Sequence, residues 1–281
     1  MWLADNWKEY EVIDCSEGEK LERWGKYTLL RPDPQVIWNT KKEDKHWKHL
    51  NAHYHRSKKG GGEWEFFDLP KQWDIHYRSL TFHLKPFSFK HTGLFPKQAV
   101  NWDWFSDKIK KAGRPVKVLN LFAYTGGATL AAKSAGADVT HVDSVKPVVS
   151  WARENMEVSG LDGVRWIVED ALKFVQREVR REKKYNGIIL DPPAYGRGAN
   201  GEKWVLEENI NELITLCGQL LESSNSFLVL NLYSMGLSAL LARGIVRQLV
   251  GNCSGEQFGE LYFTDSYEKS LPLGVYYRLW R

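Results

Sequence analysis

The stretch VLNLFAYTGGA at residues 118–128 decides the fold. An apolar, strand-like run leads directly into a turn with two glycines, and a segment of helical length follows. A strand, a glycine-containing turn and a helix in this order bring free backbone N–H groups to the carboxyl edge of a parallel sheet, where α/β folds bind ligands. The stretch therefore predicts both a fold class and the place of a ligand site.

The chain continues this pattern from about Val116, because apolar runs alternate with amphipathic segments of helical length, as in βαβ units. Strands are predicted at 116–121, 139–143, 164–168, 187–191 and 226–232, and helices after Gly127 and at 147–159, 171–182, 206–222 and 237–250. Residues 257–264 and 275–280 predict an antiparallel hairpin. The predicted fold class is α/β, with a mostly parallel sheet of seven strands that ends in this hairpin.

The first 95 residues differ from the rest, since short β-rich pieces at 26–30, 64–68 and 78–84 are separated by proline, glycine and charge. We therefore predict two domains: a small β-rich one at 1–95, a candidate for substrate binding, and a catalytic one at 96–281. Between Lys41 and Lys59, seven Lys or Arg stand against two acids, with Trp47 and Tyr54 interleaved. This segment is a candidate surface for nucleic acid.

The composition is that of a globular protein. The 281 residues are 26% charged and 43% hydrophobic, which excludes wholesale disorder and a fibrous repeat. No apolar run reaches the roughly 18 residues of a membrane span, and no signal peptide pattern opens the chain, so a cytoplasmic protein without a membrane partner is expected. The three cysteines form no CxxC pair, which excludes a thiolate zinc site. The net charge of +4 is compatible with a nucleic-acid partner.

Two common phosphate-binding patterns do not fit the chain. A dinucleotide site would need G-x-G-x-x-G after the first strand, but Phe122 and Tyr124 stand where its first glycines belong. The phosphate loop G-x-x-x-x-G-K-[ST] does not occur either. A ligand at this edge is therefore expected to carry no pyrophosphate.

Acidic residues end the next two strands. Asp143 ends 139–143 in HVDS, where a carboxylate can accept hydrogen bonds from two ribose hydroxyls. The structural alternative is a helix N-cap, although Ser144 could cap the same helix. Asp170 follows the third strand in VEDA. Two acids and a glycine turn on one edge favour a nucleoside ligand.

The fourth strand ends in IILDPPAYG, which aims Asp191 at the same edge. Pro192 and Pro193 restrict the backbone that follows, so its carbonyls face a ligand and do not close a helical turn. Tyr195 then offers a flat surface for a base. Taken alone, this motif could equally be a tight loop, but its neighbours favour function. Asp191, Pro192, Pro193 and Tyr195 are the predicted catalytic residues.

These motifs carry a resemblance. Residues 116–281 resemble a class I S-adenosylmethionine-dependent methyltransferase, a family with a Rossmann-like sheet, because NLFAYTGG, VDS followed by WAREN, EDA and DPPAY match its motifs in order and spacing. The chain is similar in particular to the branch of bacterial large-subunit ribosomal RNA methyltransferases that modify cytosine C5 or guanine N7. In that branch a segment similar to HTGLFPKQ, residues 91–98, precedes the catalytic domain.

The resemblance implies that S-adenosyl-L-methionine is the cofactor. It implies further that Asp143 holds the ribose, that Asp170 reads the adenine, and that Phe95 and Gln98 cover the cofactor. The cofactor-binding residues implied in this way are Phe95, Gln98, Phe122, Tyr124, Thr125, Gly126, Asp143, Ser144, Asp170, Ala171 and Asp191.

One departure from this branch bears on the acceptor atom. Cytosine-C5 members need a cysteine after the fifth strand, because C5 becomes nucleophilic only when a thiolate has added to C6. Here the loop reads LNLYSMGLS, and Ser234 stands nearest the cysteine position. Cys217 lies on the preceding predicted helix, where it is expected to be buried packing. A base nitrogen is therefore the favoured acceptor, with Tyr233 and Ser234 at the border of its pocket.

The histidine-rich segment HWKHLNAHYH, residues 46–55, permits three readings. A helix would place His46, His49 and His53 on one face with the spacing of metal ligands. The sequence shows no cysteine or well-placed carboxylate to complete the set, and methyl transfer from a sulfonium needs no metal, so no metal site is expected. The other two interpretations are that the segment forms a basic aromatic surface that faces RNA, or that it is a solvated loop.

Together these features predict an S-adenosylmethionine-dependent methyltransferase that acts on a base nitrogen in RNA, with ribosomal RNA as one candidate. Two alternatives remain. The acceptor could be a protein side chain or a small molecule, or the chain could bind the cofactor without turnover. The sequence does not indicate the oligomeric state.

Overall fold

The computed structural model describes residues 1–281 except 1, 4, 58–60, 88–89, 199–200 and 234–235. The chain forms two compact units. We call residues 98–261 and 274–281 the α/β unit, and residues 2–97 and 262–273 the N-terminal unit. Among the described residues, no helix is both long and apolar enough to cross a membrane.

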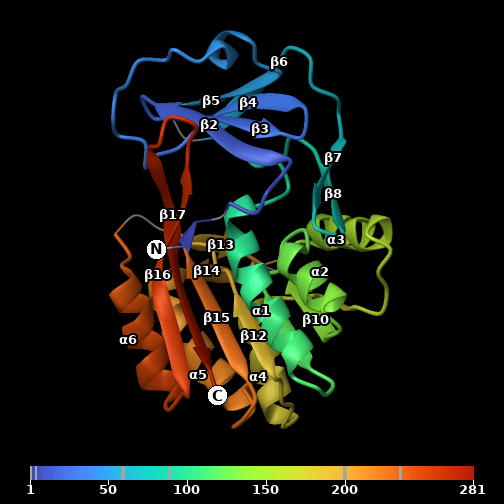
Figure 1. Ribbon diagram of the computed structural model, residues 1–281. Coiled ribbons are helices and arrows are strands. Elements are labelled where there is room, and N and C mark those ends of the chain that lie inside the picture. The colour runs from blue at the N-terminus through green and yellow to red at the C-terminus, as the bar shows by residue number, and fades with distance from the viewer. Residues whose placement is uncertain (1, 4, 58–60, 88–89, 199–200, 234–235) are drawn as a thin grey trace. The chain divides into compact units, whose positions relative to one another are not determined.

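The α/β unit is built on the seven predicted strands, which follow the order β16-β17-β15-β12-β9-β10-β11, and the two-residue β1 is hydrogen-bonded next to β16 (Figure 1). The strands β15, β12, β9, β10 and β11 pair in parallel, and β17 pairs antiparallel with β15. The bounds are β9 Lys117–Leu121, β10 Asp138–Asp143, β11 Arg165–Val168, β12 Gly187–Leu190, β15 Phe227–Leu232, β16 Gly255–Thr264 and β17 Ser270–Trp280, with the short β1 at Trp2–Leu3. The fold class is confirmed, and the five parallel strands begin and end within one residue of their predicted bounds.

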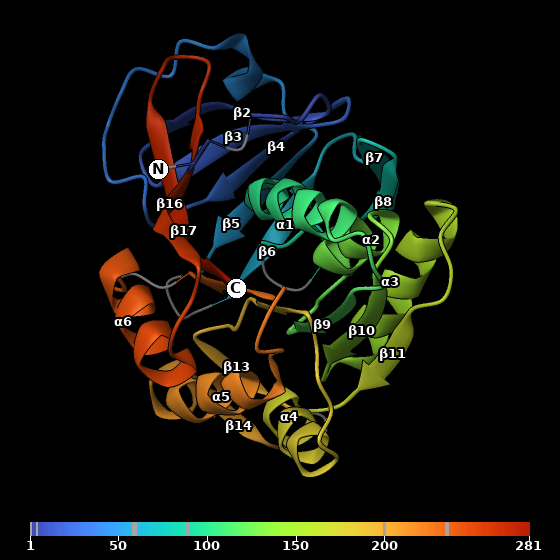
Figure 2. The same cartoon turned by 60° about the horizontal axis from the view of Figure 1, so that its bottom comes forward.

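Helices cover both faces of this sheet (Figures 1 and 2). The helices α1, α2 and α3 lie on one face, and α4, α5 and α6 lie on the other, where they bury the main apolar core. Their bounds are α1 Ala99–Lys111, α2 Gly127–Ser134, α3 Lys146–Val158, α4 Ala171–Arg180, α5 Leu206–Leu220 and α6 Ala239–Val250. Five of the six were predicted, but α1 was not, although its buried Trp102, Phe105 and Ile109 have helical spacing.

The N-terminal unit is β-rich, as expected. A five-stranded sheet has the order β2-β3-β4-β5-β6, and β7 and β8 form a separate pair. The bounds are β2 Tyr10–Ser16, β3 Glu19–Trp24, β4 Tyr27–Pro32, β5 Ala52–Arg56, β6 Gly62–Phe66, β7 Trp73–Tyr77 and β8 Leu80–Leu84. A single 3-10 turn at Lys45–Lys48 precedes β5. The prediction that His46, His49 and His53 share one face of a helix is therefore wrong, because His53 lies on strand β5.

The boundary between the units differs from the predicted division after residue 95. It falls after Lys97, and the N-terminal unit also includes residues 262–273, the tip of the C-terminal hairpin. The reason is the length of β17, which has 11 residues, whereas its partner β15 has 6. Part of β17 therefore extends past the end of β15. At the tip, the Lys269 ammonium donates to Asp14 at 2.7 Å, so the tip bonds within the N-terminal unit.

Candidate functional site

The loop after β9 has an unusual backbone. Phe122 and Tyr124 have φ angles of 53° and 50°, and Gly126 has a φ of 92°. Only glycine reaches the left-handed region readily, so the two aromatic residues store local strain, which is typical of functional loops. The Ala123 N–H donates to the Val142 carbonyl at 3.1 Å, which ties this loop to the end of β10.

Gly126 also permits a close approach of helices. A Cβ atom at this position would lie 3.0 Å from the Leu130 side chain and 3.1 Å from Ala152. From α3, the buried Asn155 donates its amide to the Thr125 carbonyl at 2.9 Å. Asn155 is the last residue of the WAREN motif, and this hydrogen bond gives its side chain a structural role. The loop is therefore held by α3 as well as by β10.

Asp143 joins the loops after β9 and β10. Its carboxylate accepts the Tyr124 N–H at 2.9 Å and the Val145 N–H at 3.0 Å. Burial raises the pKa of Asp143, and hydrogen bonds from the backbone N–H groups of Val145, Tyr124 and Ser144 oppose that rise. The alternative that Asp143 caps the following helix is wrong, because the N-cap of α3 is Val145. Each oxygen retains acceptor capacity beyond its amide bond, as a ribose site requires.

Asp170 is the N-cap of α4, and its carboxylate accepts the Lys173 N–H at 3.0 Å. Ala171 follows as the first, buried residue of this helix. The neighbouring Glu169 forms a two-point ion pair with Arg177, with both N–O distances at 2.6 Å. Asp170 thus has a structural role that the sequence analysis did not consider, and its predicted contact with adenine stays a prediction.

Asp191 lies at the end of β12, where a buried polar network fixes it. The Gln98 amide donates to its Oδ2 at 2.8 Å, and the Asn101 amide donates to Gln98 Oε1 at 3.0 Å. The Asn101 amide also donates to Asn231 Oδ1 at 2.7 Å, and Arg278 Nε donates to Asn101 Oδ1 at 2.7 Å. Gln98 therefore positions the predicted catalytic carboxylate from a rigid support.

Asn101, Asn231 and Arg278 are residues that the sequence analysis missed. Arg278 is fully buried, and burial lowers the pKa of its guanidinium to about 10, so it remains charged at neutral pH. Its guanidinium also lies 4.6 Å from the ring centroid of Tyr276. Partners that are more than a hundred residues apart leave no local pattern in a single sequence.

The loop after β12 presents the remaining predicted catalytic residues. Pro192 is buried and Pro193 is exposed, and the Trp204 indole donates to the Pro193 carbonyl at 2.6 Å. Tyr195 is 53% exposed, and it begins a short strand, β13 (Tyr195–Arg197), that pairs with β14 (Lys203–Val205). The Trp204 ring lies 4.8 Å from that of Phe122, so the loops after β9 and β12 touch through these aromatic side chains.

The other predicted residues have separate outcomes. Cys217 is fully buried on α5, and burial raises the pKa of its thiol, which confirms that it is packing. Tyr233 is 38% exposed just after β15. Ser234 lies outside the described residues. Phe95 belongs to the N-terminal unit, so its predicted place over the cofactor stays a prediction.

The parallel pairing brings these loops to one edge. Leu121 pairs with Val142 and with Leu190, and Asp143 pairs with Val168, so the strands β12, β9, β10 and β11 end together. This edge carries the strained loop, Asp143, Asp170 and Asp191. It is the place where open α/β sheets bind ligands.

Comparisons with known proteins agree with this geometry. A family model described as S-adenosylmethionine-dependent methyltransferase matches residues 19–243. The chain is 31% identical over 171 residues to the ribosomal RNA large subunit methyltransferase K/L of Shewanella frigidimarina. It is 33% identical over 119 residues to a putative ribosomal RNA large subunit methyltransferase of Methanocaldococcus jannaschii. The alignments cover 58% and 42% of this chain, and 23% and 30% of those relatives.

Solved structures extend the likeness to nearly the whole chain. A crystal structure of an S-adenosylmethionine-dependent methyltransferase from Agrobacterium tumefaciens is 36% identical, with a TM-score of 0.92 over 97% of this chain and 90% of that one. A putative methyltransferase from Streptococcus mutans shares the fold, with 15% identity and a TM-score of 0.73 over 98% of this chain and 76% of that one. With the family model over most of its length, the chain belongs to the S-adenosylmethionine-dependent methyltransferases.

Proposed function

We propose that the chain transfers the methyl group of S-adenosylmethionine to a nitrogen of a nucleobase in RNA. The observation that carries this proposal is the loop after β12, where Gln98 fixes Asp191 and an exposed tyrosine, Tyr195, follows the two prolines. A fixed hydrogen-bond acceptor beside a flat aromatic surface suits a flipped or unstacked base.

In this proposal, the loops after β9, β10 and β11 hold the cofactor. Asp143 accepts hydrogen bonds from the ribose hydroxyls, while the amides of Tyr124 and Val145 keep its carboxylate in place. Gly126 supplies the positive φ of 92° that this tight loop needs, so that the backbone around Thr125 borders the cofactor. Asp170 and Ala171 border the adenine at the start of α4. The bound cofactor supplies an activated methyl group on its sulfonium sulfur.

The chain's own residues then align the acceptor. Asp191 accepts a hydrogen bond from the acceptor amine and the Pro192 carbonyl accepts a second, so the nitrogen lone pair points at the methyl group. Tyr195 stacks on the base. The methyl group would pass from the sulfonium to this nitrogen, and the proton that the nitrogen then loses would go to water while Asp191 holds the amine. Most of the catalytic effect is alignment, since the methyl group is already activated.

Two observations favour RNA and nitrogen over the other acceptors. The curated relatives are named as ribosomal RNA large subunit methyltransferases, although this chain spans only about a quarter of their length. The residues 230–238 contain no cysteine, and Cys217 is buried with a raised thiol pKa, so neither supplies the thiolate that cytosine C5 needs.

A transfer assay tests the proposal. Purified protein is incubated with methyl-labelled S-adenosylmethionine and either deproteinised ribosomal RNA or a cell protein extract, and the digested RNA nucleosides are identified by mass spectrometry. We expect label on a base nitrogen of RNA and none on protein. Label on a ring carbon, or on protein alone, would contradict the proposal.

The basic segment gives a second prediction. Lys42 is half-buried, is paired with Glu17 at 2.9 Å and lies over the Trp47 ring. Lys41, Lys45 and Lys48 are exposed, and Lys41 has only a solvent-exposed ion pair with Glu43 at 3.9 Å. If the three exposed lysines contact phosphates, their replacement by alanine should reduce the log–log salt slope of RNA binding by roughly 0.7 per lost contact. Fluorescence titration over a range of salt concentrations measures this slope.

The control is a matched loss of charge elsewhere. Replacing the exposed Lys110, Lys111 and Lys117 by alanine removes the same charge from the end of α1 and the start of β9. The slope should then stay within roughly 0.3 of the wild-type value, because these residues lie away from the ligand edge. An equal decrease in both variants would show that the basic segment has no special part in RNA binding.

A further inference from the structure

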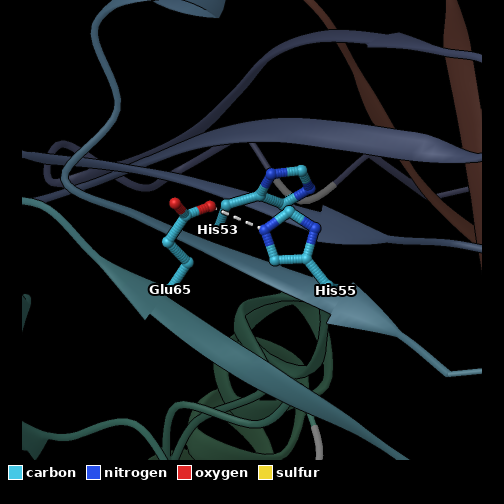
Figure 3. Close-up of side chains that lie close together, drawn as sticks. All are labelled: His53, His55 and Glu65. Atoms are coloured by element: carbon cyan, nitrogen blue, oxygen red, sulfur yellow. Dashed lines mark hydrogen bonds and ion pairs between the residues drawn. The ribbon is translucent and has the colours of Figure 1, made fainter.

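We propose that His53, His55 and Glu65 of the N-terminal unit form a binding site for a divalent transition metal, with Zn²⁺ as the best match (Figure 3). One ligand atom of each side chain lies within 4.8 Å of the others. This group differs from the helical set of His46, His49 and His53 considered from the sequence, because Glu65 is contributed by the neighbouring strand β6. The proposal is independent of methyl transfer.

The strand pairing explains why these residues converge. His53 and His55 are two residues apart on β5, so both point to the same face of the sheet, while Ala52 and Tyr54 are buried on the other. In the antiparallel pair β5–β6, Glu65 lies directly opposite His53. Glu65 is thus diagonal to His55, within reach across the strands. Figure 3 shows the two rings next to each other with the Glu65 carboxylate beside them.

The spacing of the donor atoms suits one ion. The imidazole centroids of His53 and His55 are 3.8 Å apart, and His55 Nε2 lies 2.8 Å from Glu65 Oε2. Ligand atoms on a tetrahedral Zn²⁺ lie about 3.3 Å apart, given bonds of about 2.0–2.1 Å. Small rotations of side chains that are exposed or half-buried are enough to admit the ion between them.

A second carboxylate orients His53. The Nε2 atom of His53 lies 2.7 Å from Oε1 of Glu19, on β3. A hydrogen bond donated from Nε2 to this carboxylate leaves Nδ1 as the ring nitrogen of His53 that can ligate a metal. A carboxylate behind a ligating histidine is a common feature of zinc sites.

The ligand types point to the metal. Two imidazoles and one carboxylate form a set that binds Zn²⁺ with a fourth position open to water. Mg²⁺ prefers oxygen ligands and would not select two imidazoles. The ion would bridge β5 to β6, which is the edge strand of its sheet, so binding should also raise the melting temperature of the N-terminal unit.

The alternative is that this group binds no metal, and that His55 and Glu65 are simply hydrogen-bonded to each other. Titration calorimetry of the whole chain with zinc chloride, in a buffer that does not chelate, separates the two. We expect one Zn²⁺ per chain with a Kd on the order of micromolar. His55→Gln and Glu65→Gln should each weaken binding by roughly tenfold or more, and Glu19→Gln by about tenfold.

The matched control is His76→Gln. His76 is also an exposed histidine with a carboxylate partner, Glu9, 3.1 Å away, but it belongs to no three-ligand group among the described residues. Its loss should leave the Zn²⁺ affinity unchanged. Absence of binding at millimolar Zn²⁺ would overturn the proposal, as would equal affinity in wild type and His55→Gln, which would place the ion elsewhere. Glu65 is exposed, so the Glu65→Gln variant should fold normally. If His55→Gln does not fold, the Zn²⁺ affinity of Glu65→Gln tests the proposal.

Discussion

Replacing Asp191 by asparagine is expected to lower kcat for methyl transfer to RNA by about 10²–10³-fold. Asparagine keeps an oxygen that can accept the Gln98 amide, at 2.8 Å in the wild type, so the shape of the site is preserved. It loses the negative charge that would hold the acceptor amine and stabilise it as positive charge develops on nitrogen. Initial rates at saturating cofactor and RNA measure the effect.

Two controls make this prediction specific. Asp138→Asn changes an exposed carboxylate at the start of β10, the end of that strand that lies away from the ligand edge, and it should leave kcat unchanged. Gln98→Ala removes the group that positions Asp191, and its effect should be smaller than that of Asp191→Asn, because the charge remains. If Asp191→Asn keeps more than about a third of the wild-type rate, the carboxylate does not have the proposed part in the reaction.

The central strands were predictable because each of them is short and mostly apolar, and helix-length segments separate them. Strand β12, for example, is a fully buried GIIL between Asn186 and Asp191. Such runs belong to parallel strands that are covered on both faces. The loop residues that follow them were predictable for the same reason, since the end of a parallel strand fixes the edge at which its loop lies.

Helix α1 was missed for a different reason. Its buried Trp102, Phe105 and Ile109 have the spacing of a helix, but the segment precedes the first strand of the sheet. It therefore lies outside the alternation of strands and helices that begins at about Val116. The hydrophobic spacing alone would have been sufficient to predict this helix.

The contacts between distant residues could not be predicted. Asn101 bonds to Asn231 and Arg278, which are 130 and 177 positions away in the chain. Glu65 meets His53 and His55 only because β5 pairs with β6 in one particular register. Such pairings depend on tertiary structure, and local sequence carries no trace of them.

Replacing Asp143 by alanine is expected to weaken the binding of S-adenosylmethionine by about 1.5–3 kcal/mol, or roughly 10–150-fold, through the loss of charge-assisted hydrogen bonds. Calorimetry with S-adenosylmethionine or its demethylated product measures the change. Asp138→Ala, at the other end of the same strand, should bind as the wild type does. An unchanged Kd in folded Asp143→Ala would contradict the assignment of the ribose to Asp143.

A loosened loop would also weaken binding, because Asp143 holds the amides of Tyr124 and Val145. The pH dependence separates the two causes. Burial raises the pKa of Asp143, and ribose hydroxyls would favour its charged form, so binding should lower that pKa. Wild-type affinity should then fall as the pH is lowered through the raised pKa of the cofactor-free protein, and Asp143→Ala should lack this part of the pH dependence. The same pH profile in both proteins would mean that Asp143 acts only by supporting the loop.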